Sequence, residues 1–223
     1  MLTPKISLPK ITLEKDSFLD VLNRRFSCRN FRDAPLSTKE ISLLLWSTNG
    51  LKIDATTEAT RILPSAGATY PLEIFLVVGK GGIEGVEEGV YRYDYYTHSL
   101  WRIKSGDVRK QLTLACLNQN FILQAPVSIA ICAQYERTTS FYGQRGYRYV
   151  IMEAGHACQN LYLICSYLHL GTVEVGAFED EKVKKVHLLR KGRFIKTFYL
   201  VRCYNYIGKG WKPKNYPTRF FNF

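Results

Sequence analysis

Two arginines and a serine at alternate positions are the first candidates for chemistry. The segment 24–31 reads RRFSCRNF and separates two expected helices. In an extended backbone, side chains two residues apart point to the same side, so Arg25, Ser27 and Arg29 would converge. Two guanidinium groups and a hydroxyl suit a phosphate group. The alternative is a solvated arginine-rich loop, and these residues alone leave both possibilities open.

A second candidate is a loop of small residues directly before an apolar run. The segment 63–73 reads LPSAGATYPLE, and its first turn holds Pro64, Ser65, Ala66 and Gly67. Small residues between two prolines leave backbone N–H and C=O groups accessible, which suits the polar edge of a flat heteroaromatic ring. Taken alone, the pattern predicts only a rigid loop.

A third candidate is the Glu-x-x-His pair formed by Glu153 and His156, a spacing found in di-iron helix bundles. Such sites need two copies of the pair and two further glutamates. None of His98, His169 and His187 has a glutamate three residues before it. We therefore expect no metal, and we interpret the pair as hydrogen-bonded groups at a helix interface.

A fourth candidate is the segment 174–178, EVGAF, at the end of an expected strand. Gly176 there would let a ligand approach the backbone, although a glycine at this place could equally mark a bend. Other familiar motifs are missing, since the sequence has no P-loop, no GxSxG and no zinc-like Cys/His spacing. The glycine-rich segment 79–85 lacks the spacing of a dinucleotide-binding loop.

The elements that must position these candidates alternate between helices and strands. A Ser-Thr-Lys-Glu capping box at 37–40 opens one of the helices. The order predicts an α+β fold with a mainly antiparallel sheet and helices packed against it. The expected helices cover about 18–25, 37–50, 107–117, 147–168 and 179–189; the expected strands cover 72–78, 127–133, 172–175 and 194–203, with a hairpin over 90–103.

The helix expected over 147–168 has almost no polar face. One apolar stripe follows helical spacing and includes Val150, Ile151 and Leu161, while the other side carries Met152 and several tyrosines. The small residues Ala154, Gly155 and Ala157 would let another backbone come close. This pattern favours a central helix that packs against its copy in a second subunit, with a core helix of a monomer as the alternative.

Composition sets wider bounds on the protein. The chain has 223 residues and a formal charge of +12, so nucleic acid, a phosphate-bearing cofactor and an anionic membrane all have to be considered as partners. Its six cysteines form no CxxC pair and mostly lie in apolar runs, which is typical of a reducing compartment. No segment has the length and apolarity of a signal peptide or a membrane span. We expect a cytoplasmic protein.

Three segments in this order carry a resemblance to a known family. They read PSAGATYPLE at 64–73, RGYRY at 145–149 and EAGHACQNLYL at 153–163. The chain resembles the nitroreductase superfamily from Arg24 to about Cys203, most closely its SagB-type or McbC-like dehydrogenase branch. The resemblance implies a nitroreductase-like fold in a single domain over 1–223, with arms at about 1–16 and 204–223 and the long helix at a dimer interface.

The resemblance also implies a cofactor and its ligands. It implies a homodimer that holds two FMN molecules at the subunit interface, with NADH or NADPH as one option for the electron donor. Arg25, Ser27 and Arg29 would hold the phosphate. The isoalloxazine ring would lie against further residues, namely Pro64, Ser65, Ala66 and Gly67 along the ring, Gly176 and Ala177 near its reactive edge, and Gln159 as a weaker candidate.

One departure from the branch concerns the substrate. The azoline dehydrogenases of the branch have a Lys-Tyr pair shortly before the Arg-Gly-Tyr-Arg segment, whereas this sequence has Phe141 and Tyr142. A phenylalanine cannot act as a base, so thiazole or oxazole formation on a peptide is in doubt. Tyr142 is kept as a candidate proton donor or substrate contact, and a packed tyrosine is the alternative.

A nucleic-acid-binding protein is the rival from another functional class. The C-terminal segment 209–221 interleaves lysines and an arginine with aromatic residues, as single-strand stacking surfaces do. In the family that the chain resembles, however, C-terminal arms commonly wrap the partner subunit. Nucleic-acid binding is therefore the less favoured hypothesis.

Overall fold

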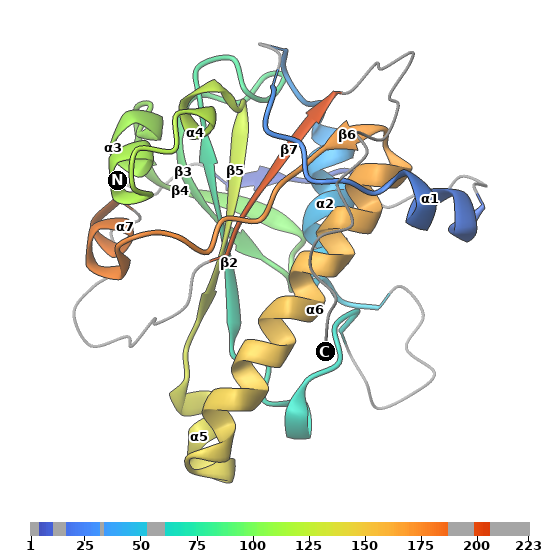
Figure 1. Cartoon of the computed structure of the whole chain (residues 1–223), viewed down its shortest axis with the longest axis vertical. Coiled ribbons are helices and arrows are strands. Elements are labelled where there is room, and N and C mark those ends of the chain that lie inside the picture. Colours follow the sequence, from blue (N-terminus) through green and yellow to red (C-terminus); the bar gives the residue numbers. More distant parts are fainter. Residues whose placement is uncertain (1–4, 11–16, 32–33, 53–60, 187–198, 206–223) are drawn as a thin grey trace, which may run out of the picture.

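The computed structural model describes residues 5–10, 17–31, 34–52, 61–186 and 199–205, with β7 described by its backbone alone. A seven-stranded sheet forms its centre, in the order β1-β4-β3-β2-β5-β7-β6, and every neighbouring pair is antiparallel. Figure 1 shows the sheet between two groups of helices. The strands are β1 (Lys5–Ser7), β2 (Leu72–Val78), β3 (Gly89–Asp94), β4 (Ser99–Ser105), β5 (Val127–Ala133), β6 (Leu170–Gly171) and β7 (Tyr199–Asn205).

The two inner strands, β2 and β5, are buried on both faces. They pair along their whole length, from Leu72 opposite Ala133 to Val78 opposite Val127. Successive side chains point to opposite faces of a strand. Ile74 and Leu76 therefore pack into one apolar core, while the alternate residues of the same strand pack into a second core on the other face.

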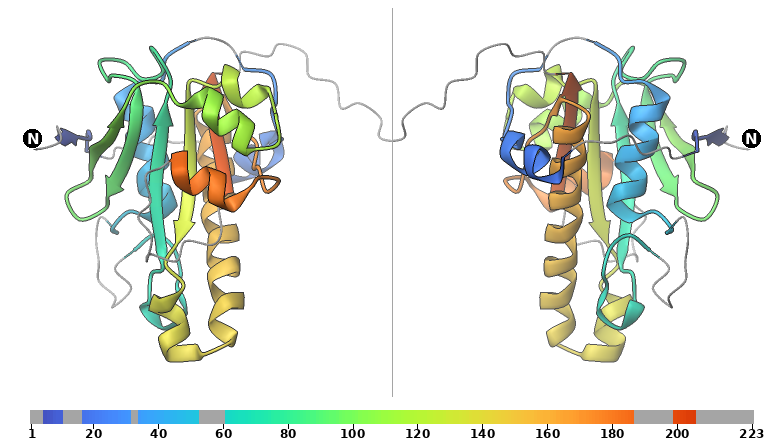
Figure 2. Two further views of the ribbon diagram at one scale, coloured as in Figure 1. Left: turned by 90° about the vertical axis from the view of Figure 1, so that its left-hand side faces the viewer. Right: turned by 90° about the vertical axis from the view of Figure 1, so that its right-hand side faces the viewer.

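Helices cover both faces of the sheet, and Figures 1 and 2 show the layers from three sides. On one face lie α1 (Phe18–Arg24), α2 (Thr38–Asn49) and α6 (Arg145–Tyr167). On the other lie α3 (Arg109–Ala115), α4 (Phe121–Gln124) and α7 (Asp180–Val186). The α+β class and the mainly antiparallel sheet are thus confirmed.

The helix α6 extends past the end of the sheet, where it meets α5 (Glu136–Tyr142) (Figure 1). Its buried side includes Val150, Ala154, Ala157 and Leu161, as the helical spacing predicts. Ile151 belongs to the apolar stripe of the expected helix, yet 48% of it is exposed in the single chain. This side of α6 is therefore open to a partner.

Three local expectations need correction. The strand expected over 172–175 is displaced, because β6 covers only Leu170–Gly171 and Thr172 forms an isolated bridge to Ser27. The segment 5–7, expected within an N-terminal arm, is an edge strand paired with β4. Residues 204–205, expected to begin the C-terminal arm, pair with β6 as the end of β7. Residues 206–223, with the basic aromatic segment, lie outside the described part of the chain.

Candidate active site

The first cluster of candidate residues lies where the turn after α1 meets α6. The bridge to Thr172 includes a hydrogen bond of 2.8 Å from the Cys28 N–H to the Thr172 carbonyl, and it fixes this turn in space. The Ser27 hydroxyl lies 3.1 Å from the Tyr162 hydroxyl, and the Arg25 guanidinium lies 5.4 Å from the centre of the Tyr162 ring. The structure therefore brings Arg25 and Ser27 to one side chain of α6.

Two contacts of this cluster, Tyr162 and Glu174, were not among the residues predicted for it from the sequence. The Tyr162 hydroxyl accepts a 2.9 Å hydrogen bond from the Glu174 N–H. Burial raises the pKa of the Glu174 carboxyl, and a hydrogen bond with Cys158 opposes that rise. Tyr162 thereby joins the turn after α1 to the segment after β6, a contact between parts of the chain that no sequence spacing indicates.

Arg29, the third residue of the expected phosphate cradle, follows Ser27 by two residues and is exposed. Arg25 and Arg29 form no ion pair with any carboxylate in the described residues, so both guanidinium groups remain available to an anion. No contact joins Arg29 to Ser27 or Arg25 in the described part of the chain. The hydroxyl and one guanidinium of the expected phosphate cradle both contact Tyr162, and the second guanidinium follows two residues later without a contact to either among the described residues.

The second cluster is the loop before β2, which includes the short helix η1 (Ala66–Ala68). The Ala68 N–H donates to the Ser65 carbonyl at 3.1 Å, which closes the turn. Gly67 has a left-handed backbone with φ +57°, a conformation that glycine adopts without steric strain. Pro64 and Gly67 are exposed, and Ser65 and Ala66 are half-buried. The loop thus presents its backbone at the surface, as expected for the edge of a ring.

Ser65 is held from below by α6. Its hydroxyl donates a 2.6 Å hydrogen bond to Glu153 Oε2 and accepts one of 2.9 Å from the Tyr70 N–H. Only 3% of Glu153 is exposed, and burial raises the pKa of its carboxyl to about 7, against the opposing effects of Ser65 and Arg61. His156, the other member of the Glu-x-x-His pair, is exposed. The pair therefore does not act as one site.

Tyr142, the last residue of α5, reaches over the same loop. A methyl group built on Gly67 would lie 2.5 Å from the Tyr142 hydroxyl, so the hydroxyl and the glycine backbone are close neighbours. The ring of Tyr142 packs edge to face against Tyr149 of α6, with 5.1 Å between centroids. Phe141 beside it is 78% exposed. The end of α5 can thus meet a molecule that lies on the loop.

The remaining candidates lie apart from these clusters. Gly176 and Ala177 are exposed in the segment that follows β6, and a side chain on Gly176 would meet no atom within 4 Å. The Ala177 carbonyl accepts a 2.9 Å hydrogen bond from the Gln119 amide. Gln159 is exposed on α6. The structure leaves these three residues accessible and shows no contact between them and either cluster.

Both clusters lie along one helix. Glu153 and Tyr162 are nine residues apart on α6, which at about 1.5 Å and about 100° per residue places them roughly 13 Å apart along the axis and on nearly opposite sides of the helix. The arginines of one cluster suit a phosphate, and the accessible glycine loop of the other suits a flat ring, so the kinds of residue present fit FMN. The exposed side of α6 beside them is apolar at Tyr147, Ile151 and Met152.

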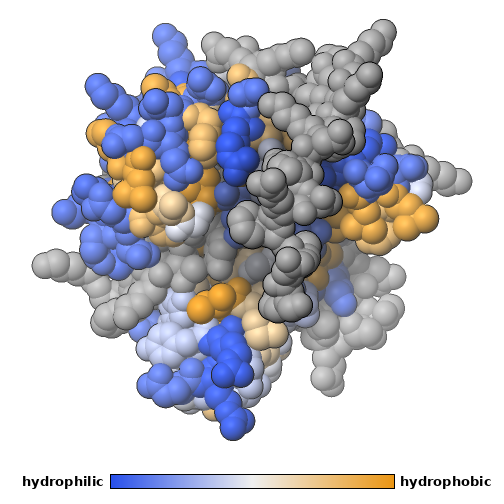
Figure 3. All heavy atoms as spheres, viewed as in Figure 1, coloured by the Kyte–Doolittle hydropathy of each residue, from blue (hydrophilic) through white to orange (hydrophobic). Residues whose placement is uncertain are grey.

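A second apolar surface belongs to α1. Phe18, Leu19 and Leu22 are exposed there, and Figure 3 shows apolar surface at the right-hand edge of the molecule, where α1 lies in Figure 1. Phe18 also borders a hollow of about 310 Å³ between α1, α2 and α6, whose walls include Trp46, Leu163 and Tyr167. Apolar surface that is contiguous and exposed on a single chain is typical of an interface.

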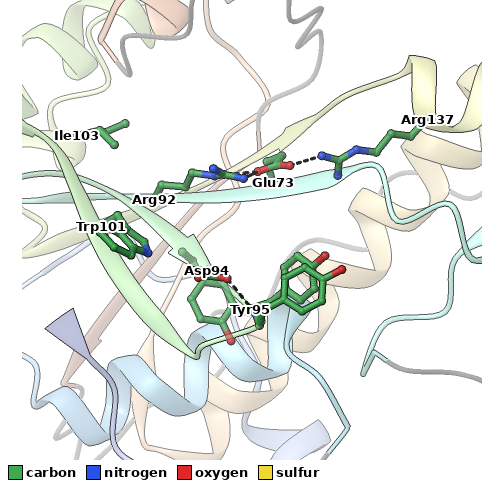
Figure 4. Close-up of a pocket in the computed structure, with 9 residues that line it drawn as sticks. Glu73, Arg92, Asp94, Tyr95, Trp101, Ile103 and Arg137 are labelled. Carbon is green, nitrogen blue, oxygen red and sulfur yellow. Dashed lines mark hydrogen bonds and ion pairs between the residues drawn. The ribbon is translucent and has the colours of Figure 1, made fainter. Parts of the chain in front are cut away.

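A separate pocket of about 540 Å³ lies beside β2, β3 and β4 (Figure 4). Glu73 lies at its floor and bonds Arg92 at 2.8 Å and Arg137 at 2.5 Å. Figure 4 shows both guanidinium groups turned toward this carboxylate. Because the two cations are already paired, the pocket offers an anion less than the turn after α1 does.

The described residues include neither a metal-binding cluster nor a membrane-spanning helix. Within the described ranges no group of three or more histidine, cysteine, aspartate or glutamate side chains is placed to hold a metal ion. No helix among these residues has the length and apolarity that crossing a bilayer requires.

A family model and several sequence relatives match the chain. Residues 22–201 match the model of the nitroreductase family. MJ1384 of Methanocaldococcus jannaschii, a protein provisionally named a nitroreductase, is 46% identical over 184 residues, which cover 82% of this chain and 89% of MJ1384. The microcin B17-processing protein McbC of Escherichia coli is 28% identical over 170 residues, which cover 70% of this chain and only 58% of McbC.

Solved structures share the fold. A provisionally named nitroreductase from Ralstonia eutropha superposes with a TM-score of 0.76 at 22% identity, covering 91% of this chain and 90% of the other. Another from Desulfovibrio desulfuricans, solved in complex with FMN, superposes with a TM-score of 0.60 at 17% identity, covering 92% and 94%. At these identities the likeness concerns the fold, and the nitroreductase-like architecture is confirmed.

Proposed function

The chain belongs to the nitroreductase family, in its McbC-like branch, and is an oxidoreductase; we propose that it carries FMN at the interface of a homodimer. The observation that supports this most directly is the pair of clusters that contact α6: one holds arginines that pair with no carboxylate among the described residues, and the other has an open glycine backbone. When bound, FMN supplies hydride transfer at its N5 atom. The protein's own residues bind it, orient it and exclude water.

We propose that Arg25, Ser27 and Arg29 hold the FMN phosphate. Arg25 and Ser27 are fixed against Tyr162, and both arginines are free of ion pairs with the described carboxylates. A terminal phosphate gains most from charged donors that no carboxylate has already satisfied. The Ser27 hydroxyl can keep its contact with Tyr162 as acceptor while it donates to a phosphate oxygen.

We propose that Pro64, Ser65, Ala66 and Gly67 lie along the isoalloxazine ring. The left-handed turn at Gly67 and the exposure of its backbone support this position, because a side chain there would block close approach. Gly176 and Ala177 would contact the reactive edge of the ring from the segment after β6, and Gln159 would contact it from α6. Tyr142, above Gly67, would contact the substrate or donate a proton to it.

The homodimer is supported by the apolar side chains that a single chain leaves exposed on α6. Tyr147, Ile151 and Met152 are 41%, 48% and 53% exposed, and a methyl group on Gly155 would meet no atom within 4 Å. A second copy packed on this side would remove the apolar surface from water.

The two candidate reactions differ in their substrates. A SagB-type dehydrogenase would take hydride from a small molecule or a peptide heterocycle, whereas a nitro or quinone reductase would pass hydride from NADH or NADPH to its acceptor. Phe141 stands where the azoline dehydrogenases have lysine, and it is exposed beside the proposed ring loop. A phenylalanine cannot act as the base that the lysine of those enzymes is thought to assist, which favours the reductase.

One pair of assays separates the candidates. FMN-loaded protein is mixed with NADH or NADPH and a quinone or nitroaromatic acceptor, and in parallel with a thiazoline-containing peptide under air. We expect oxidation of the nicotinamide with turnover of the acceptor and no oxidation of the thiazoline. Thiazole formation without nicotinamide oxidation would reverse the assignment in favour of the dehydrogenase.

A further inference from the structure

The carboxyl group of Glu153 is buried directly beneath the loop that we place along the flavin ring. Glu153 lies on α6 and Ser65 on the loop, 88 residues earlier in the chain, yet their side chains are joined by a 2.6 Å hydrogen bond. The same Ser65 hydroxyl accepts the Tyr70 N–H. One carboxyl oxygen therefore anchors the hydroxyl that closes the loop.

The second carboxyl oxygen has no such partner. Glu153 Oε1 is buried and, among the described residues, makes no hydrogen bond. A buried carboxylate oxygen without a donor is unfavourable, and the usual resolution is that the group binds a proton. A core position filled for packing alone would not need a carboxyl group here.

One charged group balances Glu153 in part. Arg61 is 5% exposed and acts on the carboxyl through its charge, but its guanidinium is engaged elsewhere. It donates to Asn49 Oδ1 at 3.0 Å and stacks over the rings of Tyr95 and Tyr70 at 3.6 and 4.4 Å. It lowers the pKa of Glu153 without forming an ion pair with it.

Among the described residues, three further titratable groups lie near Glu153 or the loop above it. Tyr142 of α5 lies over Gly67, and Tyr149 and His156 are neighbours of Glu153 on α6 itself. Burial is the largest effect on the carboxyl, and it raises the pKa to about 7, where small changes in the surroundings decide whether the proton is bound. Adding electrons to a ring on the loop above would be such a change.

We propose that Glu153 is a positioning residue that acts on the flavin through Ser65 and takes up a proton from solvent when the flavin is reduced. The inference rests on the proposed function. As a hydride donor delivers two electrons and a proton to the ring, the Glu153 carboxylate binds a second proton, so that negative charge does not accumulate beneath the loop. Ser65 keeps its bond to Oε2, and the new O–H lies on Oε1.

The proposal predicts how the midpoint potential of bound FMN depends on pH. In the wild-type protein above neutral pH, the carboxylate disfavours reduction, and at low pH the neutral carboxyl does not. Glu153→Gln keeps the size and the acceptor for Ser65 but carries no charge at any pH. The two proteins should have matching potentials at pH 5.5, and the potential of Glu153→Gln should be the higher one at pH 8.5.

Two further variants complete the experiment, which uses FMN-loaded full chains and reductive titration with dithionite. Ser65→Ala leaves the carboxyl but removes its hydrogen-bond donor, which raises the pKa of Glu153 further. The pH range in which the midpoint potential changes most steeply, here called the steep region, should therefore move to higher pH. FMN affinity should fall at least threefold. Glu136→Gln, on the exposed first turn of α5, should match the wild type in both respects. Thermal melts verify that each variant is folded.

The possible results distinguish a failure of the Glu153 inference from a failure of the FMN assignment. If FMN-loaded wild type and Glu153→Gln have potentials that run parallel across the pH range, and Ser65→Ala does not move the steep region, the inference is wrong while the flavin assignment stands. A folded wild-type protein that bound no FMN would overturn the proposed function and this inference with it.

Discussion

The hydroxyl of Tyr142 lies over the backbone of Gly67, so close that a methyl group on Gly67 would come within 2.5 Å of it. This contact ties the end of α5 to the loop that we place along the flavin ring. A side chain at position 67 would therefore have to displace the Tyr142 hydroxyl, in addition to the conformational requirement set by φ +57°.

Gly67→Ala should therefore weaken FMN binding more than tenfold. The left-handed backbone adds about 1–2 kcal/mol for a residue with a Cβ, and the contact with Tyr142 must also open. Gly81→Ala is the matched control, because Gly81 has φ +64° with no atom within 4 Å of the added methyl. Fluorescence titration with FMN measures both variants, and equal affinities for the two would refute the role of the Tyr142 contact.

Arg29→Ala should lower FMN affinity by about ten- to a hundredfold without changing the melting temperature of the apoprotein. A charged hydrogen bond to phosphate is worth roughly 1.5–3 kcal/mol, and no core residue is removed. Lys110→Ala on α3, an exposed cation on the other face of the sheet, is the control and should change nothing. An affinity within a factor of about two of the parent would exclude Arg29 as a phosphate ligand.

Ile151→Asp should convert a dimer into a monomer that retains little FMN. The charge would be placed on the exposed apolar side of α6, where we expect the second copy to pack. Leu114→Asp is the control, since Leu114 is 54% exposed on α3, away from that side. Light scattering gives the mass against 25.7 kDa for one chain, and a wild-type monomer that binds FMN tightly would contradict the interface site.

The stability of the apoprotein should depend on pH through Glu153. Its folded pKa, about 7, lies above the usual 4.5, so the folded state binds more protons between these values. The stabilisation is complete below pH 4.5 and is lost as the pH rises through 7. Since one pKa unit corresponds to about 1.4 kcal/mol, the full loss is roughly 3 kcal/mol at most.

The comparison that isolates this effect is with Glu153→Gln. Urea unfolding at pH 5 and pH 8 should show the wild type losing stability relative to the variant as the pH rises. A constant difference between the two proteins at both pH values would mean that the carboxyl does not change its protonation state in this range.

The sequence predicts the inner framework well, for physical reasons. The strands expected over 72–78 and 127–133 match β2 and β5, because runs of apolar residues bounded by proline or polar residues suit a strand buried on both faces. The capping box at Ser37 forms as expected, with Ser37 and Glu40 bonded reciprocally. Local patterns of this kind are complete within a few residues.

The parts that the sequence did not predict depend on contacts between distant segments. The strand expected over 172–175 is displaced because the backbone of Thr172 pairs with Ser27 and Cys28 in place of a strand. The contacts of Tyr162 with Ser27, and of Glu153 with Ser65, join residues more than 80 positions apart. No periodicity in a single sequence carries such information.

The identity of the cofactor tests the central claim most directly. The full-length protein is purified, its absorbance spectrum is recorded, and any flavin released by denaturation is identified by chromatography, with reconstitution of the apoprotein as a second step. We expect a yellow protein that releases FMN, because two arginines and a serine suit a terminal monophosphate. FAD, or no flavin even after reconstitution, would contradict it.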